Sequence, residues 1–260
     1  MKIGVLLKQV PDTETKIRVA GDGIEEGDVK WIINPYDEFA VEAAIRLKEK
    51  LGDGEVLIFS LGKSRTLDAA RTALAMGGDR AVILDDDAFE GSDAYGTAKA
   101  LAAAISKEEC GIVFTGGQAI DLDQNSVPQS VAAFLEWPHA SWIQGFEHNG
   151  DTATVKRPVG GGAVEVVEVT LPAVFTCTKG LNEPRYASLP GIMKAKRKPV
   201  TNYSADDLGV GDDVGADNAR VSLSDFKLPP GRPAGRILEG EIGDQVKELV
   251  RLLREEAKVL

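Results

Sequence analysis

The sequence predicts an α/β protein with a mainly parallel sheet that is covered by helices on both faces. Short apolar and β-branched runs alternate with helical stretches along most of the 260 residues, and this alternation is typical of parallel sheets with two covered faces. The composition, 43% hydrophobic and 27% charged, supplies enough apolar material for a core of that size. No apolar run approaches the roughly 20 residues that cross a bilayer, so we expect no membrane insertion.

Five runs bounded by Gly, Asp or Ser are predicted to form the strands: 3–7, 56–60, 80–84, 111–115 and 173–178. Between and after them, apolar residues at helical spacing predict helices over 37–51, 66–76, 93–105 and 125–135. Asp37 is a candidate cap for the first helix, which Gly52 would end. Two β-rich segments separated by Gly160–Gly162 predict a hairpin over 152–169.

The predicted organisation is one nucleotide-binding-type domain over 1–200 followed by a C-terminal arm over 201–260. After Thr201 the chain loses strand character and becomes rich in Gly, Asp and Pro. Such a segment buries little apolar surface by itself, so we expect an extended arm that lies on another surface. Residues 242–259 regain helical spacing, which predicts an amphipathic helix that needs a surface to cover.

The charge balance excludes several classes of partner. With 41 acidic and 30 basic residues and a net charge of -11, general binding to nucleic acid or to an anionic membrane is disfavoured. Cys110 and Cys177 have no metal-ligand spacing and indicate no disulfide framework, so we expect a reducing, cytoplasmic location and no metal site. The sequence also lacks a nucleophile–base pattern, and we expect no catalytic residues.

Residues 116–126, GGQAIDLDQNS, lead from a predicted strand into a helix. Glycines allow close approach of the backbone to a ligand, and free amides at a helix start bind anions without basic side chains. A phosphate site is therefore reasonable, although the segment is neither a Walker loop nor GxGxxG. A tight turn capped by Asp123 or Asn125 explains the same residues equally well.

Two further loops are predicted at the same edge of the sheet. Asn34 and Asp37 offer acceptors in the segment 33–38, although helix capping alone would explain them. The turn 60–62, Ser-Leu-Gly, follows the second strand. Three loops at the carboxyl edge of a parallel sheet favour a nucleotide ligand.

Residues 181–199 concentrate positive charge beside apolar side chains: Arg185, Lys194, Lys196, Arg197 and Lys198 with Leu189, Ile192 and Met193. An apolar anchor with a charged surround suits a transient protein contact. A solvated basic helix with inward apolar residues is the alternative, and composition alone favours it.

Several segments together resemble the beta subunit of electron-transfer flavoproteins: KIGVLLKQVPDT, INPYDEFAVEAAIRLKE, RTALAMGGDRAV, GGQAIDLDQNSVPQSVAAFLEWP and LNEPRYASLPGIMKAKRK. The resemblance covers most of residues 1–200. It implies a heterodimer in which a larger alpha subunit holds the redox-active FAD. The beta subunit is then a nucleotide-binding bowl with a structural AMP, and the arm over 201–260 wraps the alpha subunit.

The resemblance also implies the residues of each site. The cofactor-binding residues would be Leu6, Asn34, Tyr36, Asp37, Leu61, Gln118, Asp123, Asn125, Ser126 and Val127. Asp123, Asn125, Ser126 and Val127 would lie nearest the phosphate, and Tyr36 would approach the flavin across the subunit boundary. The partner-docking residues would be Arg185, Tyr186, Leu189, Ile192, Met193, Lys194 and Lys196, with Leu189 as the apolar anchor.

The implied function is electron transfer in fatty acid beta-oxidation. The protein would dock flavin dehydrogenases such as acyl-CoA dehydrogenases and pass electrons toward a quinone oxidoreductase. One alternative is a bifurcating member with a second FAD in this chain, which VPDT at 10–13 and NPYD at 34–37 favour. The segment 117–127 lacks the Gly-Asp-x-Ala-Gln-Val-Gly run of that branch, so we expect AMP. A nucleotide-sensing regulatory domain is a second alternative, but it would not explain residues 181–199.

Overall fold

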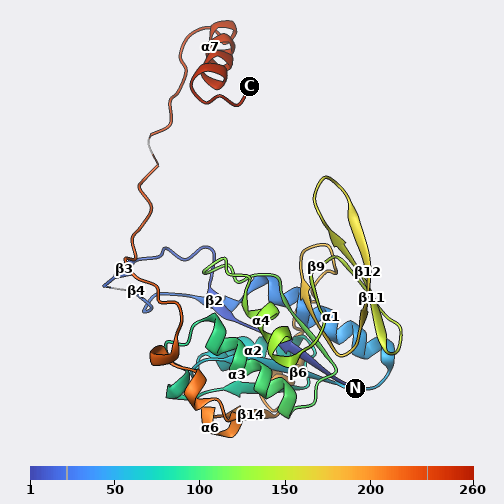
Figure 1. The fold of residues 1–260 in the computed structure, drawn as a ribbon. Coiled ribbons are helices and arrows are strands. Elements are labelled where there is room, and N and C mark those ends of the chain that lie inside the picture. The colour runs from blue at the N-terminus through green and yellow to red at the C-terminus, as the bar shows by residue number, and fades with distance from the viewer. Residues whose placement is uncertain (22, 233) are drawn as a thin grey trace. The chain divides into compact units, whose positions relative to one another are not determined.

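A computed structural model describes residues 1–21, 23–232 and 234–260, and these divide into two compact units, 1–224 and 225–260. The first unit is built on a seven-stranded sheet in the order β14-β7-β6-β1-β8-β13-β9 (Figure 1). Every neighbouring pair in this sheet is parallel. The strands are β1 (Lys2–Leu6), β6 (Glu55–Leu61), β7 (Arg80–Leu84), β8 (Ile112–Gly116), β9 (His139–Ile143), β13 (Ala173–Cys177) and β14 (Val200–Tyr203). The predicted α/β fold is confirmed.

Helices cover both faces of the sheet, because alternate residues of its strands are apolar on both sides. α1 (Pro35–Leu51), α2 (Thr66–Met76) and the short α5 (Leu189–Ala195) contribute to one core, which includes Ile58. α3 (Ala94–Lys107), α4 (Val127–Leu135) and α6 (Ala205–Leu208) contribute to the other, which includes Phe59. Successive strand residues point to opposite faces, so Ile58 and Phe59 join different cores.

The chain reverses its direction of travel across the sheet at β1. β6 and β7 follow β1 on one side, whereas β8 pairs with β1 on the other side. Ligands of open parallel sheets bind at such a switch point, at the carboxyl ends of the strands. The fold therefore directs attention to the loops that follow β1 and β8.

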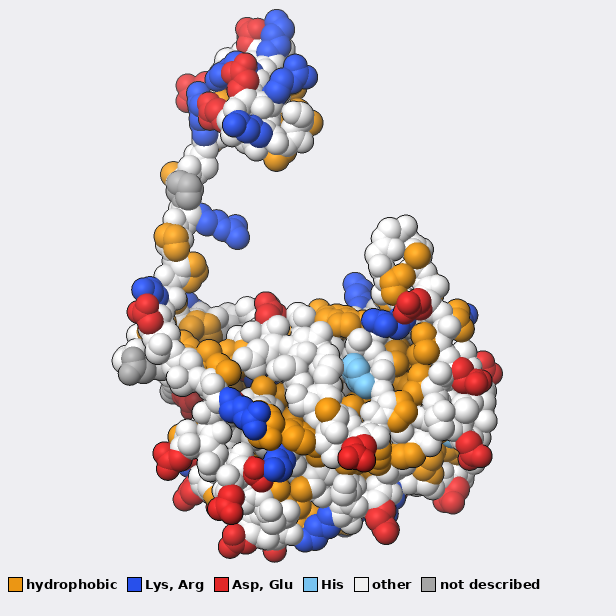
Figure 2. All heavy atoms as spheres, in the orientation of Figure 1, with side chains coloured by type: hydrophobic (Ala, Val, Ile, Leu, Met, Phe, Trp, Pro, Cys, Tyr) orange, Lys and Arg blue, Asp and Glu red, His pale blue; other side chains and the backbone are white. Residues whose placement is uncertain are grey.

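Small antiparallel sheets add to this framework. β10 (Gly145–His148), β11 (Thr152–Pro158) and β12 (Val164–Thr170) form three strands, which confirms the predicted hairpin. Figure 2 shows apolar side chains on the projecting part of this sheet. Val164 and Val166 of β12 are 58% and 63% exposed. β2 (Gln9–Pro11) pairs with β5 (Trp31–Ile33), and β3 (Val19–Ala20) pairs with β4 (Gly23–Ile24). These very short strands have no periodicity long enough to predict them.

The first unit continues past residue 200, where the sequence suggested a boundary. β14 is an edge strand on β7, and α6 and the 3-10 turns η2 (Gly211–Asp213) and η3 (Ala216–Asn218) follow it within the same unit. β14 was not among the predicted strands, although strand structure does end close to the predicted position, at Tyr203 within the described residues. The strand has only four residues, and polar Thr201 and Asn202 at its centre leave no apolar pattern from which it could be predicted.

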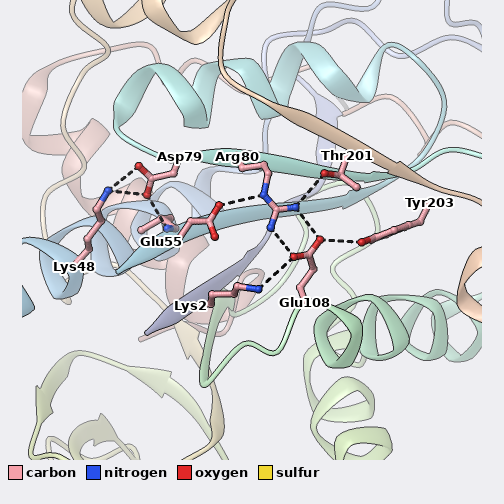
Figure 3. A network of polar contacts seen from close by, with 9 residues as sticks. Lys2, Lys48, Glu55, Asp79, Arg80, Glu108, Thr201 and Tyr203 are labelled. Atoms are coloured by element: carbon pink, nitrogen blue, oxygen red, sulfur yellow. Dashed lines mark hydrogen bonds and ion pairs between the residues drawn. The ribbon is translucent and has the colours of Figure 1, made fainter. Parts of the chain in front are cut away.

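An ionic network joins the amino ends of the strands, opposite the edge that carries the loops (Figure 3). Arg80 begins β7 and donates to Glu55 (3.1 Å), Glu108 (2.8 Å) and Thr201 (3.0 Å). Tyr203 Oη donates to Glu108 Oε1 at 3.0 Å. The hydrogen bond from Arg80 to Glu108 holds the pKa of Glu108 below its usual value, although burial acts to raise it. The network fastens the edge strand β14 to the middle of the sheet.

The second unit contains α7 (Ile242–Glu255), which confirms the predicted C-terminal helix. Its apolar side chains recur at helical spacing and are exposed, with Ile242 at 77% and Val246 at 53%. Among the described residues, none of the helices is long and apolar enough to span a membrane.

Candidate functional site at the carboxyl edge

A cavity of about 810 Å³ opens at the switch point between β1 and β8. The loops after β1, β6 and β8, the first turns of α1, α3 and α4, and residues 216–223 surround it. The predicted cofactor-binding residues that line it are Leu6, Asn34, Asp37, Leu61, Gln118, Ser126 and Val127. Its volume lies within the about 300–1,000 Å³ of small-molecule sites.

Asp37 connects the two loops that define the switch point. Its Oδ2 accepts a hydrogen bond from Lys8 N (2.7 Å), and its Oδ1 accepts from Gly116 N (3.0 Å) and Asn34 Nδ2 (2.9 Å). Asn34 also donates to Gln118 O (2.9 Å) and accepts from Ile120 N (3.2 Å). The helix begins at Pro35 with no side-chain cap from Asn34. The expectation that Asp37 caps this helix is wrong, since its carboxyl binds neighbouring loops instead.

The same burial perturbs the carboxyl group. Only 4% of Asp37 is exposed. Burial raises the pKa of Asp37 to about 7, because the loss of water outweighs the three N–H donors that lower it. Its protonation therefore changes near neutral pH.

Two glycines at the end of β8 make room for protein groups. A Cβ on Gly116 would lie 2.3 Å from Asp37 Oδ1, and one on Gly117 would lie 3.2 Å from the ring of Trp142. Protein groups occupy the space of a Cβ at both glycines, and Gly116 also lines the cavity. The two glycines allow Asp37 and Trp142 to approach the strand end.

The turn into α4 leaves the helix start open. Ser126 is the residue before the helix and makes no side-chain cap hydrogen bond within the described structure. The alternative of a cap from Asp123 or Asn125 is wrong. Asp123 is exposed and accepts from Gln118 Nε2 (3.1 Å), while the Asn125 amide lies against Trp142 Nε1 and Gly117 O, both at 3.0 Å. Pro128 has no N–H, so the first amides that this helix start offers to an anion are those of Val127 and Gln129.

Three predicted cofactor residues are not among those that line the cavity: Tyr36, Asp123 and Asn125. Tyr36 stacks edge-on against Trp142, with ring centroids 5.8 Å apart. Sequence reasoning missed Lys8, Asp93, Tyr95 and Arg220, which do line the cavity. Lys8 could have been found, because it follows the first strand within the motif KIGVLLKQVPDT. Asp93 and Arg220 could not, because no local sequence pattern relates two residues so far apart in the chain.

The predicted docking segment exposes its apolar side chains. Tyr186 is 98% exposed, Leu189 73% and Met193 67%. Leu189 begins α5, which Ser188 caps by accepting from Gly191 N at 3.1 Å. Ile192, Lys194 and Lys196 are exposed on or next to the same short helix. The alternative of inward-packed apolar residues is wrong for these side chains.

Arg185 is the exception among the predicted docking residues. Its Nε donates to Glu42 Oε2 (2.8 Å) and its Nη1 to Glu49 Oε1 (2.7 Å), which fastens the segment to α1. Burial alone would raise the pKa of Glu42, but its hydrogen bonds to Arg185 and Arg46 reverse the effect and lower it. Much of the guanidinium is thus engaged within the chain.

The cysteines and acidic residues offer no metal centre. Within the described ranges, no group of three or more His, Cys, Asp or Glu side chains is placed to hold a metal ion. Cys110 and Cys177 are both buried and free. Burial raises the pKa of the Cys110 thiol to about 12, so this thiol is protonated at neutral pH.

The fold and the cavity define a doubly wound α/β protein with a cavity at the sheet's switch point. Residues 23–208 match the family model of the electron transfer flavoprotein domain. The chain is 42% identical to an electron transfer flavoprotein subunit beta of Bacillus subtilis, over 100% of both chains. The mitochondrial electron transfer flavoprotein subunit beta of Oryza sativa subsp. japonica is also 42% identical, again over 100% of both chains. The electron transfer flavoprotein subunit beta of Syntrophomonas wolfei is 39% identical over 100% of this chain and 98% of its own.

The chain therefore belongs to the electron transfer flavoprotein family, as a beta subunit. The resemblance drawn from the sequence motifs is confirmed. As a member of this family, the chain is an electron-carrier subunit rather than an enzyme.

Proposed function

We propose that this subunit binds one AMP in the cavity between β1 and β8 and that the nucleotide has a structural role. The observation that carries the proposal is the position of the cavity at the switch point, with most of the expected nucleotide residues in its lining. Apolar Leu6, Leu61 and Val127 suit the faces of a purine. The uncapped start of α4 suits its phosphate.

The polar lining fits the remainder of such a ligand. Asn34 and Gln118 place amide groups at the strand ends, where a ribose or purine edge offers donors and acceptors. Lys8 adds a positive charge that Asp121 partly neutralises, with Nζ and Oδ2 2.7 Å apart. In a chain of net charge -11, these local donors are the means by which an anionic ligand is held.

The larger assembly is part of the same proposal. The redox-active FAD belongs to an alpha subunit, and this chain helps to form its site. The second unit, with the exposed apolar side chains of α7, would cover part of the alpha subunit. Tyr36 is half-buried beside Trp142 and would approach the flavin at the subunit boundary.

Residues 181–199 would dock flavin dehydrogenases, such as acyl-CoA dehydrogenases, in fatty acid beta-oxidation. Exposed Leu189 and Met193 supply apolar anchors, and Lys194 and Lys196 supply positive charge around them. Electrons would then pass from the flavin toward a quinone oxidoreductase. We place this activity in the cytoplasm, in line with two free cysteines and no paired disulfide.

The decisive experiment is the ratio of FAD to AMP released by denaturing the purified heterodimer. One FAD and one AMP are expected. Two FAD and no AMP would overturn the AMP assignment and favour a bifurcating member. A chain that folds alone as a stable oligomer and binds AMP reversibly would instead favour a nucleotide sensor.

A further inference from the structure

Residues 215–223, here called the strap, form part of one wall of the cavity. Six residues of the strap line the cavity together with Tyr95 and Leu101 of α3, namely Ala216, Ala219, Arg220, Val221, Ser222 and Leu223. The strap follows η2 and lies within the first unit. It has no place in the expected nucleotide motifs.

Asp93 fastens the strap to the start of α3. Its Oδ1 accepts from Tyr95 N and Gly96 N, both at 3.0 Å, and so caps the helix. Its Oδ2 accepts from Arg220 N (2.8 Å) and Val221 N (3.1 Å). Burial acts to raise the pKa of Asp93, but the four amides outweigh it and lower the pKa. The carboxyl is therefore ionised at neutral pH, and its hydrogen bonds to the strap are charge-assisted.

Three further contacts hold the strap in the same place. Ser92 Oγ accepts from Gly215 N at 2.7 Å. A Cβ on Gly91 would lie 2.7 Å from the Cβ of Ala216, so the two backbones approach more closely than other residues allow. The Arg220 guanidinium lies 3.4 Å from the centre of the Tyr95 ring, in a cation–π contact. Contacts at Gly215, at Ala216 and at Arg220 and Val221 fix the strap along the cavity wall.

We infer that the strap is a retaining element that closes over the adenylate part of the bound nucleotide. The inference rests on the proposed function. Val221 and Leu223 line the cavity although 62% and 53% of their surfaces are exposed, and an adenine ring would cover such apolar surface. Arg220 holds a positive charge at the rim, which suits a phosphate of either AMP or FAD. Release of the ligand then requires the hydrogen bonds to Asp93 to open.

The test measures the release of radiolabelled AMP, or of FAD, from the loaded heterodimer into an excess of unlabelled nucleotide. In Asp93→Asn the amide oxygen still caps α3, but its NH₂ group faces the amides of the strap. We expect release to be at least about tenfold faster, because charged hydrogen bonds are lost. Ser92→Ala, which removes the second contact, should accelerate release to a smaller extent.

Asp86→Asn is the matched control. Asp86 also bridges a cap and a distant segment, since it accepts from Ala88 N and Ala205 N, both at 3.0 Å, but it does not line the cavity. Its release rate should equal that of the wild type. Wild-type release rates in both Asp93→Asn and Ser92→Ala would overturn the strap while leaving the nucleotide site standing. A wild-type complex that retains neither AMP nor FAD would instead overturn the proposed function and the strap together.

Discussion

Arg185 pairs with Glu42 across 143 residues of sequence, with Nε and Oε2 2.8 Å apart and only 2% of the Glu42 side chain exposed. The pair joins the segment 181–199 to the middle of α1. A carboxylate that is this well buried needs its partners, because an uncompensated buried charge is strongly destabilising. Arg185 therefore positions the proposed docking segment from within the chain.

Removal of this guanidinium should cost stability. We expect Arg185→Ala to lower the free energy of unfolding of the heterodimer by about 2 kcal/mol, less than for a fully buried pair because Arg46 still contacts Glu42. Urea denaturation measures the loss. Arg185→Ala combined with Glu42→Gln should recover part of it, since the buried charge is then absent. Equal stability of Arg185→Ala and wild type would contradict the positioning role.

Asp37 should give the protein a distinctive pH dependence. Its pKa is about 7 in the folded chain and 3.8 as a free side chain. Between about pH 4 and pH 7 the folded state therefore keeps a proton on Asp37 that the unfolded state has lost. The contribution of Asp37 to the free energy of unfolding falls as pH rises through this range and is constant above it. The fall is at most about 4 kcal/mol, at 1.36 kcal/mol per pKa unit.

Asp37→Asn separates this effect from other titrations. The variant should be less stable at every pH, because the amide NH₂ faces either the Lys8 or the Gly116 N–H. The advantage of wild type over the variant should shrink as pH rises from about 4 to 7. Free energies of unfolding across this range measure the change, and an advantage that stays level with pH would show that Asp37 is ionised throughout.

The close approach at the end of β8 should make Gly116 sensitive to the smallest substitution. In Gly116→Ala the added Cβ would meet Asp37 Oδ1 at 2.3 Å, so we expect a loss of about 1–3 kcal/mol and a reduced nucleotide content. Gly111→Ala is the control just before the same strand, since its Cβ meets only the flexible Met1 side chain at 3.4 Å or more. Similar losses in both variants would remove the role assigned to the Asp37 contact.

The fold could be predicted from the sequence because its signals are local. Apolar strands such as 80–84 and Ala-rich helices such as 66–76 can be recognised from the pattern of a few consecutive residues. The loops that follow parallel strands must then lie at one edge of the sheet. β14 was hidden because an edge strand with polar Thr201 carries little apolar pattern. Its place depends on Arg80 and Glu108, which are distant in sequence.

The same distinction applies to the site. Asn34, Ser126 and Val127 were found because each lies in a motif next to a strand or helix end. In the sequence Asp93 looks like any other helix cap. Only the fold shows that its second carboxylate oxygen accepts hydrogen bonds from Arg220 N and Val221 N. The contacts of Gly116 and Gly117 could not be predicted for a related reason, since the groups that occupy the space of a Cβ come from α1 and β9.

Leu189 should be a residue whose loss affects docking and little else. Because 73% of its surface is already exposed, Leu189→Ala removes few internal contacts and should leave stability and flavin content unchanged. The rate of electron transfer from an acyl-CoA dehydrogenase should fall by about tenfold or more, as expected for an apolar anchor at the centre of an interface. Val166→Ala is the control, since Val166 is 63% exposed on the hairpin outside the docking segment. Equal slowing by both substitutions, or loss of flavin from Leu189→Ala, would exclude a docking role for Leu189.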